Sequence, residues 1–240
     1  MGRLNMRQMH HLKIRISAFS GSILMTALGI DLITVASLGT SPISSVPLVV
    51  SLYTPWTFGQ LTFVLNMAFI ALQIALLRHL FRPVELLQVA VNFVFSAAID
   101  FFMHAMAGLQ GLSWPLALAL LIVGCATLAF GICIEVASQV LMVPGDGAVK
   151  AIAQTGKWRM GTTKVVFDST MVTLAVILSF LYGGLGTLTG LGIGTLASAM
   201  LVGRFVNFFN RRVFFIERLA RLSLDDETKA AGALSKEVQS

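Results

Sequence analysis

Charged residues are scarce in this sequence, and their scarcity excludes an ordinary soluble domain. Asp, Glu, Lys and Arg make up 12% of the 240 residues, whereas 56% of the residues are hydrophobic. Soluble domains usually have about a quarter of their residues charged. A membrane span needs about 20 apolar residues, and six runs of that length fit in the chain. The composition therefore predicts an all-α integral membrane protein.

Cysteine is almost absent as well. The two cysteines, Cys125 and Cys133, lie eight residues apart in one apolar run. In a helix this spacing separates them by about 12 Å, which excludes a disulfide between them. The spacing is not that of a metal site either, so we interpret both as small buried apolar residues.

Motifs of enzyme chemistry are also lacking. The four histidines, His10, His11, His79 and His104, are scattered near the ends of apolar runs. No Ser/His/Asp set, metal-ligand cluster or phosphate loop occurs. The glycines of residues 190–194 follow no strand, which excludes a dinucleotide loop. The sequence thus predicts no enzyme, cofactor or metal. It also predicts no nucleic-acid partner, because its Lys and Arg residues lie in tails and short loops.

The chain does contain a weak internal repeat with an offset of 102 residues. Two of its three Trp residues fall on matching positions, and the match extends into the preceding apolar run. An internal repeat of this kind decides the architecture. The matching pairs are Ala27 with Ala129, Gly29 with Gly131, Ile30 with Ile132, Pro42 with Pro144, Trp56 with Trp158, Gly59 with Gly161 and Asn66 with Asp168.

Each repeat is predicted to hold three spans, with a short segment after the first one. The short segments follow helix breaks at Gly39 to Pro42 and at Pro144 to Gly147. Ser41 suits an N-cap and Pro42 suits the first helical position. The short segments either lie in the interface or enter the membrane as half-helices. The predicted spans are residues 16–36, 57–77, 84–106, 114–143, 161–182 and 187–210, and the short segments are residues 43–53 and 148–155.

The basic residues predict the orientation of this single membrane domain, with repeat 1 at about residues 14–106 and repeat 2 at about residues 114–210. The outer connections contain no Lys or Arg when both termini are placed in the cytoplasm, which is the positive-inside distribution. Three spans per repeat make the two repeats inverted. Residues 211–240 are predicted to be cytoplasmic, with an amphipathic interfacial helix at 213–224 and a polar, disordered tail. The cytoplasmic basic residues between spans and after the last one are Arg78, Arg82, Lys150, Lys157, Arg159, Arg204, Arg211 and Arg212.

Polar residues within the spans form two predicted layers. Each charge in a span costs about 2.5 to 3.5 kcal/mol, so such residues usually face the bundle interior. Lys164 and Asp168 share a helix face, and Glu135 lies at a depth where it could pair with Arg204. No basic residue is available to Asp31 and Asp100 in the outer layer, so they are protonated, bind a cation, or exchange protons with a solute. The predicted pathway residues are Asp31, Thr40, Ser41, Asn66, Asp100, Glu135, Asp146, Lys164, Asp168 and Arg204.

The starts of the two short helices suggest a second feature of a site. A helix N-terminus presents free N–H groups and a partial positive charge, which favour an anionic ligand group. Thr40 to Pro42 and Pro144 to Gly147 would then line a passage. In the alternative, both short helices lie flat on the surface as connectors.

Several of these stretches resemble the bacterial YczE/YyaS/YitT membrane protein family. The likeness covers roughly residues 14–210 and implies a multi-pass protein of the bacterial inner membrane, without a settled substrate. The Gly192 stretch has only a vague counterpart in repeat 1, so the third and sixth spans depart from the symmetry of the two repeats. The stretches are Gly39-Thr40-Ser41-Pro42, residues 57–60, Pro144-Gly145-Asp146-Gly147, residues 161–168 and residues 192–203.

These observations favour a transporter or permease for a small polar or ionised solute, because inverted repeats with broken helices are typical of transporters. Two alternatives stay open, a substrate-capture subunit of a larger transporter and a passive channel. The expected partners are the lipid bilayer and a solute or ion, and the sequence leaves open whether copies associate as a homo-oligomer. It does not identify the solute, the coupling ion or the direction.

Overall fold

The computed structural model describes residues 6–109, 111–184, 190–214, 216 and 219. Within these residues all regular structure is helical and no strand occurs. Short 3-10 turns lie at Arg78–Leu80, Pro83–Leu87 and Ala107–Leu109. The α-helices are α1 (Met6–Val35), α2 (Ser45–Ser51), α3 (Phe58–Leu77), α4 (Gln88–Ala105), α5 (Trp114–Ser138), α6 (Pro144–Gly156), α7 (Met160–Gly183) and α8 (Ile193–Arg212).

Five of these helices, α1, α3, α4, α5 and α7, are long and apolar enough to cross a membrane. Their outward faces carry large exposed hydrophobic side chains such as Phe93, Val165 and Leu181, as expected of surfaces that meet lipid. The sixth predicted span corresponds to α8, whose apolar face is interrupted by Arg204 and by two asparagines. The structure therefore shows an all-helical protein with five candidate spans.

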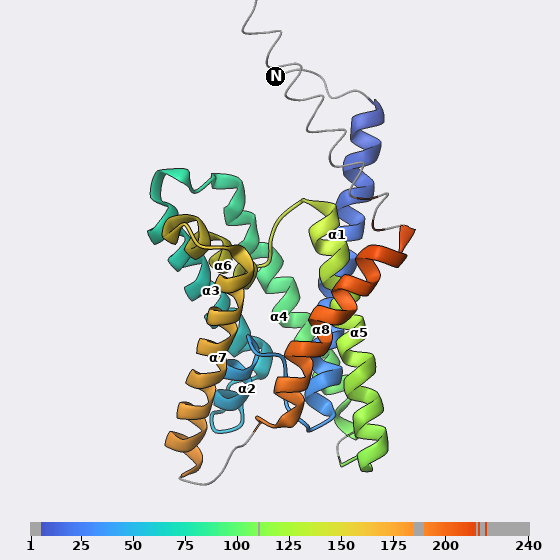
Figure 1. Ribbon diagram of the computed structural model, residues 1–240, viewed down its shortest axis with the longest axis vertical. Helices are drawn as coiled ribbons and strands as arrows, with labels where there is room; N and C mark the ends of the chain where they lie inside the picture. The colour runs from blue at the N-terminus through green and yellow to red at the C-terminus, as the bar shows by residue number, and fades with distance from the viewer. Residues whose placement is uncertain (1–5, 110, 185–189, 215, 217–218, 220–240) are drawn as a thin grey trace, which may run out of the picture.

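The long helices alternate in direction along the chain (Figure 1). The short helix α2 lies near the end of the bundle where α1 finishes, and α6 lies toward the opposite end, beside the start of α7 (Figure 1). Both short helices pack against α3 and α7. Neither is a detached surface connector, because Val49 on α2 and Val149 on α6 are both fully buried.

Local capping explains where two helices begin. The Thr57 side chain accepts the N–H of Gln60, and the Gln60 side chain accepts the N–H of Thr57, so α3 begins with a capping box. Pro144 occupies the first turn of α6, where its missing N–H costs nothing. The prediction for the first short segment was wrong, because Pro42 precedes α2 and the N-cap is Ser44 rather than Ser41.

Other boundaries differ from the prediction for local reasons. Helix α5 ends at Ser138 rather than at residue 143, because Gln139 adopts a left-handed conformation with φ of 47°. Residues 84–87 belong to a 3-10 turn, so α4 begins at Gln88. Of the predicted interfacial helix 213–224, Ile216 and Leu219 are buried against α5, whereas most of the segment and the predicted tail lie outside the described residues.

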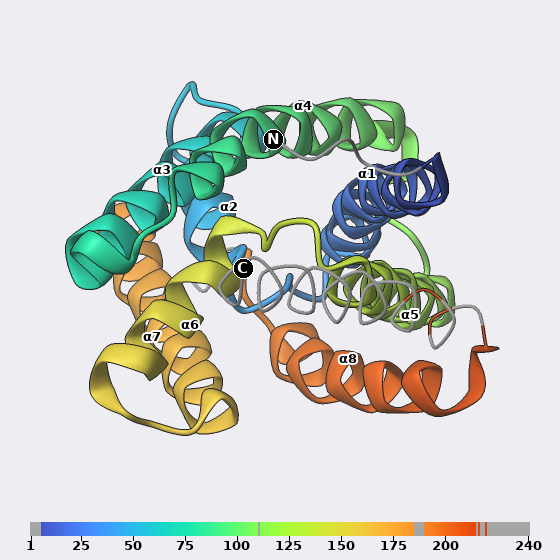
Figure 2. The same ribbon diagram turned by 90° about the horizontal axis from the view of Figure 1, so that it is seen from above.

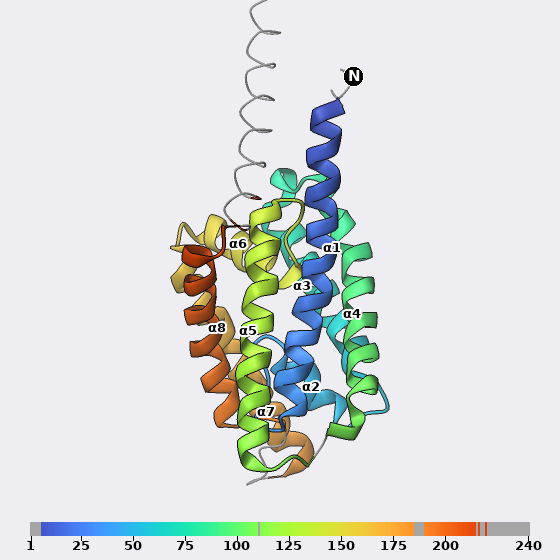
Figure 3. The same ribbon diagram turned by 90° about the vertical axis from the view of Figure 1, so that its right-hand side faces the viewer.

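Helices α1 and α5 cross closely on one side of the bundle (Figures 2 and 3). A Cβ atom on Gly29 would lie 2.7 Å from the Cα atom of Leu128, and one on Gly131 would lie 3.0 Å from the backbone nitrogen of Thr26. The offset of 102 residues relates Gly29 to Gly131 and Thr26 to Leu128. Small residues permit such close approach where lipid provides no hydrophobic drive. The same contact therefore occurs twice.

The remaining helix pairs surround this crossing. Helices α4 and α8 flank it, α4 packing on α1 and α8 on α5 (Figure 3). Seen from above, the long helices enclose α2 and the start of α6 (Figure 2). Helix α3 packs on α4 and on α6, whereas α7 packs on α2 and α6 but makes few contacts with α8.

Candidate functional site

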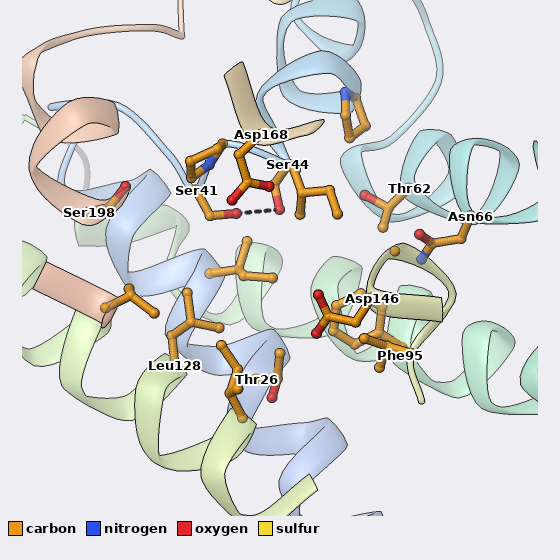
Figure 4. A pocket seen from close by; sticks show the side chains of 18 of the residues that line it. Thr26, Ser41, Ser44, Thr62, Asn66, Phe95, Leu128, Asp146, Asp168 and Ser198 are labelled. Atoms are coloured by element: carbon orange, nitrogen blue, oxygen red, sulfur yellow. Dashed lines mark hydrogen bonds between the residues drawn. The ribbon is translucent and has the colours of Figure 1, made fainter. Parts of the chain in front are cut away.

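A cavity of about 140 Å³ lies between the starts of the two short helices. Each of the eight α-helices in the described residues contributes to its lining. Figure 4 shows hydroxyl and amide side chains such as Ser44 and Asn66 around the cavity together with apolar ones such as Leu128 and Phe95. The polar residues that line it are Thr26, Ser41, Ser44, Thr62, Asn66, Glu135, Asp146, Lys164, Asp168 and Ser198.

Four ionisable residues gather at one side of this cavity. The Lys164 ammonium lies 2.9 Å from Asp146 Oδ1 and 3.4 Å from Asp168 Oδ1. Lys164 therefore bridges α6 and α7. Glu135 accepts the N–H of Val143 at 3.0 Å, and its other oxygen, Oε2, has no hydrogen-bond partner among the described residues.

A wider vestibule of about 600 Å³ lies next to these ionisable residues. It is bounded by the end of α3, the start of α4, the end of α5 and α6. Glu135 and Asp146 line both the vestibule and the cavity. Beside them Gln73 donates to Gln88 Oε1 at 3.2 Å and to the carbonyl of Pro144 at 3.1 Å. The charged end of the cavity is therefore the end that adjoins the vestibule.

Hydrogen bonds join two segments beside the cavity, residues 38–40 and residues 194–198, which we call the α8 closure and of which Ser198 lines the cavity. The N–H of Gly194 donates to the carbonyl of Leu38 at 2.8 Å. The N–H of Thr40 donates to Thr195 Oγ1 at 3.2 Å, and the Ser198 hydroxyl donates to the carbonyl of Thr40 at 3.0 Å. Thr40, Thr195 and Ser198 are all buried.

A protein-family model described as a family of unknown function, DUF6198, matches residues 13–211. The chain belongs to this family. No curated protein and no solved structure matches the chain. The match spans nearly the whole of α1 through α8, so the cavity, the vestibule and the α8 closure all lie within the DUF6198 region. The likeness to the YczE/YyaS/YitT family stays a prediction.

The structure brings together six of the ten predicted pathway residues of this DUF6198 protein. Thr40 belongs to the α8 closure instead, and Arg204 is exposed on α8. The predicted pairing of Glu135 with Arg204 is wrong, because Glu135 accepts a backbone N–H and Arg204 points away from the bundle interior. The predicted Lys164–Asp168 pair is confirmed. The six residues that line the cavity are Ser41, Asn66, Glu135, Asp146, Lys164 and Asp168.

The expectation of an anionic ligand group at the short helices does not fit the geometry. Helix α2 has only seven residues. At α6, Asp146 lies in the first turn, and Glu135 accepts the N–H of Val143 just before the helix. A carboxylate near a helix N-terminus already offsets the partial positive charge there. The protein's own acids therefore occupy the place of the expected anion.

Asp31 and Asp100 line neither the cavity nor the vestibule. Asp31 is fully buried on α1, and neither of its carboxyl oxygens has a hydrogen-bond partner among the described residues. Asp100 accepts the Thr57 hydroxyl at 2.6 Å and the N–H of Gly59 at 2.7 Å. It therefore joins α4 to the first turn of α3, where an acid is favourable.

We expect Asp100 to stabilise the DUF6198 fold rather than to bind a solute. Replacing Asp100 with alanine removes both bonds at the start of α3 and should lower the free energy of unfolding by about 2 kcal/mol. Ser113→Ala is the matched control, because Ser113 is the N-cap of α5 without a side-chain bond. Thermal unfolding of both variants in detergent measures the effect. Unchanged stability of Asp100→Ala would contradict the capping role.

Several residues of the site could not be found from the sequence pattern. Thr195 and Ser198 resemble ordinary small packing residues, and their closure partners lie more than 150 positions earlier in the chain. Gln73 and Gln88 were not singled out, although both are buried. Cys125 and Cys133 are free and buried, as expected. Among the described residues, no group of three or more His, Cys, Asp or Glu side chains is placed to hold a metal ion.

Proposed function

We propose that this DUF6198 protein is an integral membrane transporter for a small solute, with the central cavity as its binding site. The observation that carries the proposal is a cavity between two broken helices, which adjoins a vestibule and lies beside the α8 closure. Broken helices at the centre of a bundle supply the polar groups that a solute site needs. A site reached from one end at a time is what alternating access requires.

Two inverted repeats of three spans each, with α8 as the sixth span, would account for the packing. The repeat offset relates α1 through α3 to α5 through α7, and chain order then pairs α4 with α8. Under this relation the pair α1–α4 corresponds to α5–α8, α2–α3 to α6–α7, and α3–α6 to α7–α2, and all these pairs are in contact. The pair α3–α4 lacks an equally close α7–α8 counterpart. The repeats therefore adopt different conformations, as the two halves of an alternating-access transporter do.

The basic residues favour a cytoplasmic vestibule. Arg82 and Lys150 line it, and the N-terminal end of α1 lies at the same end of the bundle (Figure 1). Positively charged loops are retained on the cytoplasmic side of a membrane. In the proposed orientation both termini are cytoplasmic, the structure is open toward the cytoplasm of a bacterial cell, and the α8 closure seals the outer end.

Flux into proteoliposomes tests the proposal. The probes are small ammonium compounds, small carboxylates and neutral polar compounds, each compared with protein-free liposomes. We expect at least one class to show protein-dependent flux. Glu135→Gln should slow that flux roughly tenfold or more, because a hydrogen bond to a charged group contributes about 1.5 to 3 kcal/mol.

Glu237→Gln is the matched control, because it makes the same chemical change outside residues 13–211, which the DUF6198 model matches. Its flux should equal that of the unsubstituted protein. The transporter proposal would be contradicted by an absence of protein-dependent flux for all three classes. Equal flux in the Glu135 and Glu237 variants would contradict the assigned site.

A further inference from the structure

The cavity has an excess of acid. Its lining contains three carboxyl groups and one amine, and it includes no arginine or histidine. Lys164 contacts both Asp146 and Asp168, so one positive charge serves two carboxylates. Glu135 is in no ion pair with Lys164, which contacts the two aspartates instead. The lining therefore contains more acidic than basic groups.

Glu135 has the geometry of a ligand-binding acid. Its side chain is 3% exposed and lines the cavity. One carboxyl oxygen, Oε1, is held by the N–H of Val143, which fixes the carboxyl group against the start of α6. The other oxygen, Oε2, is buried and has no hydrogen-bond partner within the described part of the chain. Buried polar atoms are nearly always hydrogen-bonded, so an unpartnered buried oxygen beside a cavity indicates a missing donor.

The rest of the lining favours an organic cation over a metal ion. Aliphatic and aromatic side chains such as Ile30, Phe95 and Leu128 form much of the wall. A hard metal ion needs six or more oxygen ligands, whereas here Asp146 and Asp168 are engaged by Lys164. An alkylammonium group needs only a few acceptors together with apolar surface. The volume of about 140 Å³ corresponds to four or five waters at about 30 Å³ each, which suits a molecule of a few heavy atoms.

We propose that the central cavity binds a small organic ammonium ion, with Glu135 accepting its N–H groups and the aliphatic wall contacting its alkyl part. This inference rests on the proposed function and names the substrate class of the same site. The hydroxyls of Thr26, Ser44 and Thr62 lie around the cavity (Figure 4) and supply further acceptors. Lys164 keeps Asp146 and Asp168 in place and is not displaced.

Thermal unfolding of the purified full-length protein in detergent tests the inference. The probes are propylammonium chloride, sodium propionate, propionamide and potassium chloride, titrated at constant ionic strength. A ligand that binds only the folded state raises the unfolding midpoint in a saturable way. We expect a saturable rise of several degrees, on the order of 5 °C, with propylammonium alone.

The effect should depend on Glu135. Glu135→Gln should weaken the apparent propylammonium affinity about tenfold or more, and Glu237→Gln should leave it unchanged. Isothermal titration on the unsubstituted protein provides a readout that does not depend on the folding of a variant. The inference would be overturned if propionate, propionamide or potassium stabilised the protein as much as propylammonium does. It would also be overturned if none of the probes stabilised the protein.

The two proposals fail in different ways. Protein-dependent flux of a carboxylate or a neutral compound, without propylammonium binding, would retain the transporter and overturn the ammonium site. Saturable propylammonium binding without flux of any probe would retain the site and overturn the transporter.

Discussion

Replacing Gly29 with leucine is expected to abolish the folded protein. A Cβ atom at this position would lie 2.7 Å from the Cα atom and 2.8 Å from the Cβ atom of Leu128. Backbone on α5 cannot move aside without separating α1 from α5, the most extensively packed helix pair of the bundle. Overpacking by flexible side chains costs about 1 to 3 kcal/mol, and a backbone clash exceeds that range. This loss is a large fraction of the free energy of unfolding, which is usually about 5 to 15 kcal/mol.

Gly21→Leu is the matched control on the same helix. Gly21 is exposed, and a Cβ atom there would meet nothing within 4 Å. Size-exclusion chromatography of both variants in detergent measures the outcome. Gly29→Leu should aggregate or fail to accumulate, while Gly21→Leu should elute as the unsubstituted protein does. A monodisperse Gly29→Leu protein with an unchanged unfolding midpoint would show that the crossing is not as close as described.

Local patterns in the sequence were enough to predict much of the framework. The repeat offset located both short helices between long ones, because Pro42 and Pro144 mark chain breaks in equivalent places. The spacing of Lys164 and Asp168 predicted a contact on one helix face, which the structure confirms. Such predictions succeed where the interaction depends on neighbouring residues of one element.

Interactions between distant elements could not be predicted in the same way. Asp146 and Lys164 lie on different helices, so the sequence placed them only at the same end of the membrane. Asp100 was assigned to a pathway because no basic residue was available to it, yet its partners are a hydroxyl and a backbone N–H. The positions of charged residues in a sequence do not reveal hydrogen bonds from backbone N–H groups. The pairing of Glu135 with Arg204 was wrong for a related reason, because its partner is the N–H of Val143.

Replacing Gly194 with alanine is expected to open the outer end of the cavity. A Cβ atom there would lie 2.5 Å from the carbonyl oxygen and 2.7 Å from the carbonyl carbon of Leu38. The hydrogen bond from the N–H of Gly194 to Leu38 would then be lost, together with those that involve Thr40. At about 1 kcal/mol for each hydrogen bond, the loss of even two of these three bonds favours the open state by roughly tenfold or more. Alanine is also the better helix former, so α8 itself is not weakened.

Gly203→Ala on the same helix is the control for this variant, because a Cβ atom at Gly203 would meet nothing within 4 Å. The readout is the labelling of a single cysteine in place of Ser44, which is buried and lines the cavity, in a background where Cys125 and Cys133 are alanine. Gly194→Ala should permit labelling from the outer side at least tenfold faster than Gly203→Ala does. Equal rates would show that the α8 closure does not control access.

The same reporter in the otherwise unsubstituted protein tests the central claim most directly, that the cavity is reached from one side of the membrane. A small membrane-impermeant methanethiosulfonate is applied to inside-out and to right-side-out vesicles, with Gln139→Cys in the vestibule as a reporter of sidedness. We predict that the Ser44 reporter reacts in inside-out vesicles and is protected in right-side-out vesicles. Faster reaction from the outer side, or equal reaction from both sides, would contradict the account.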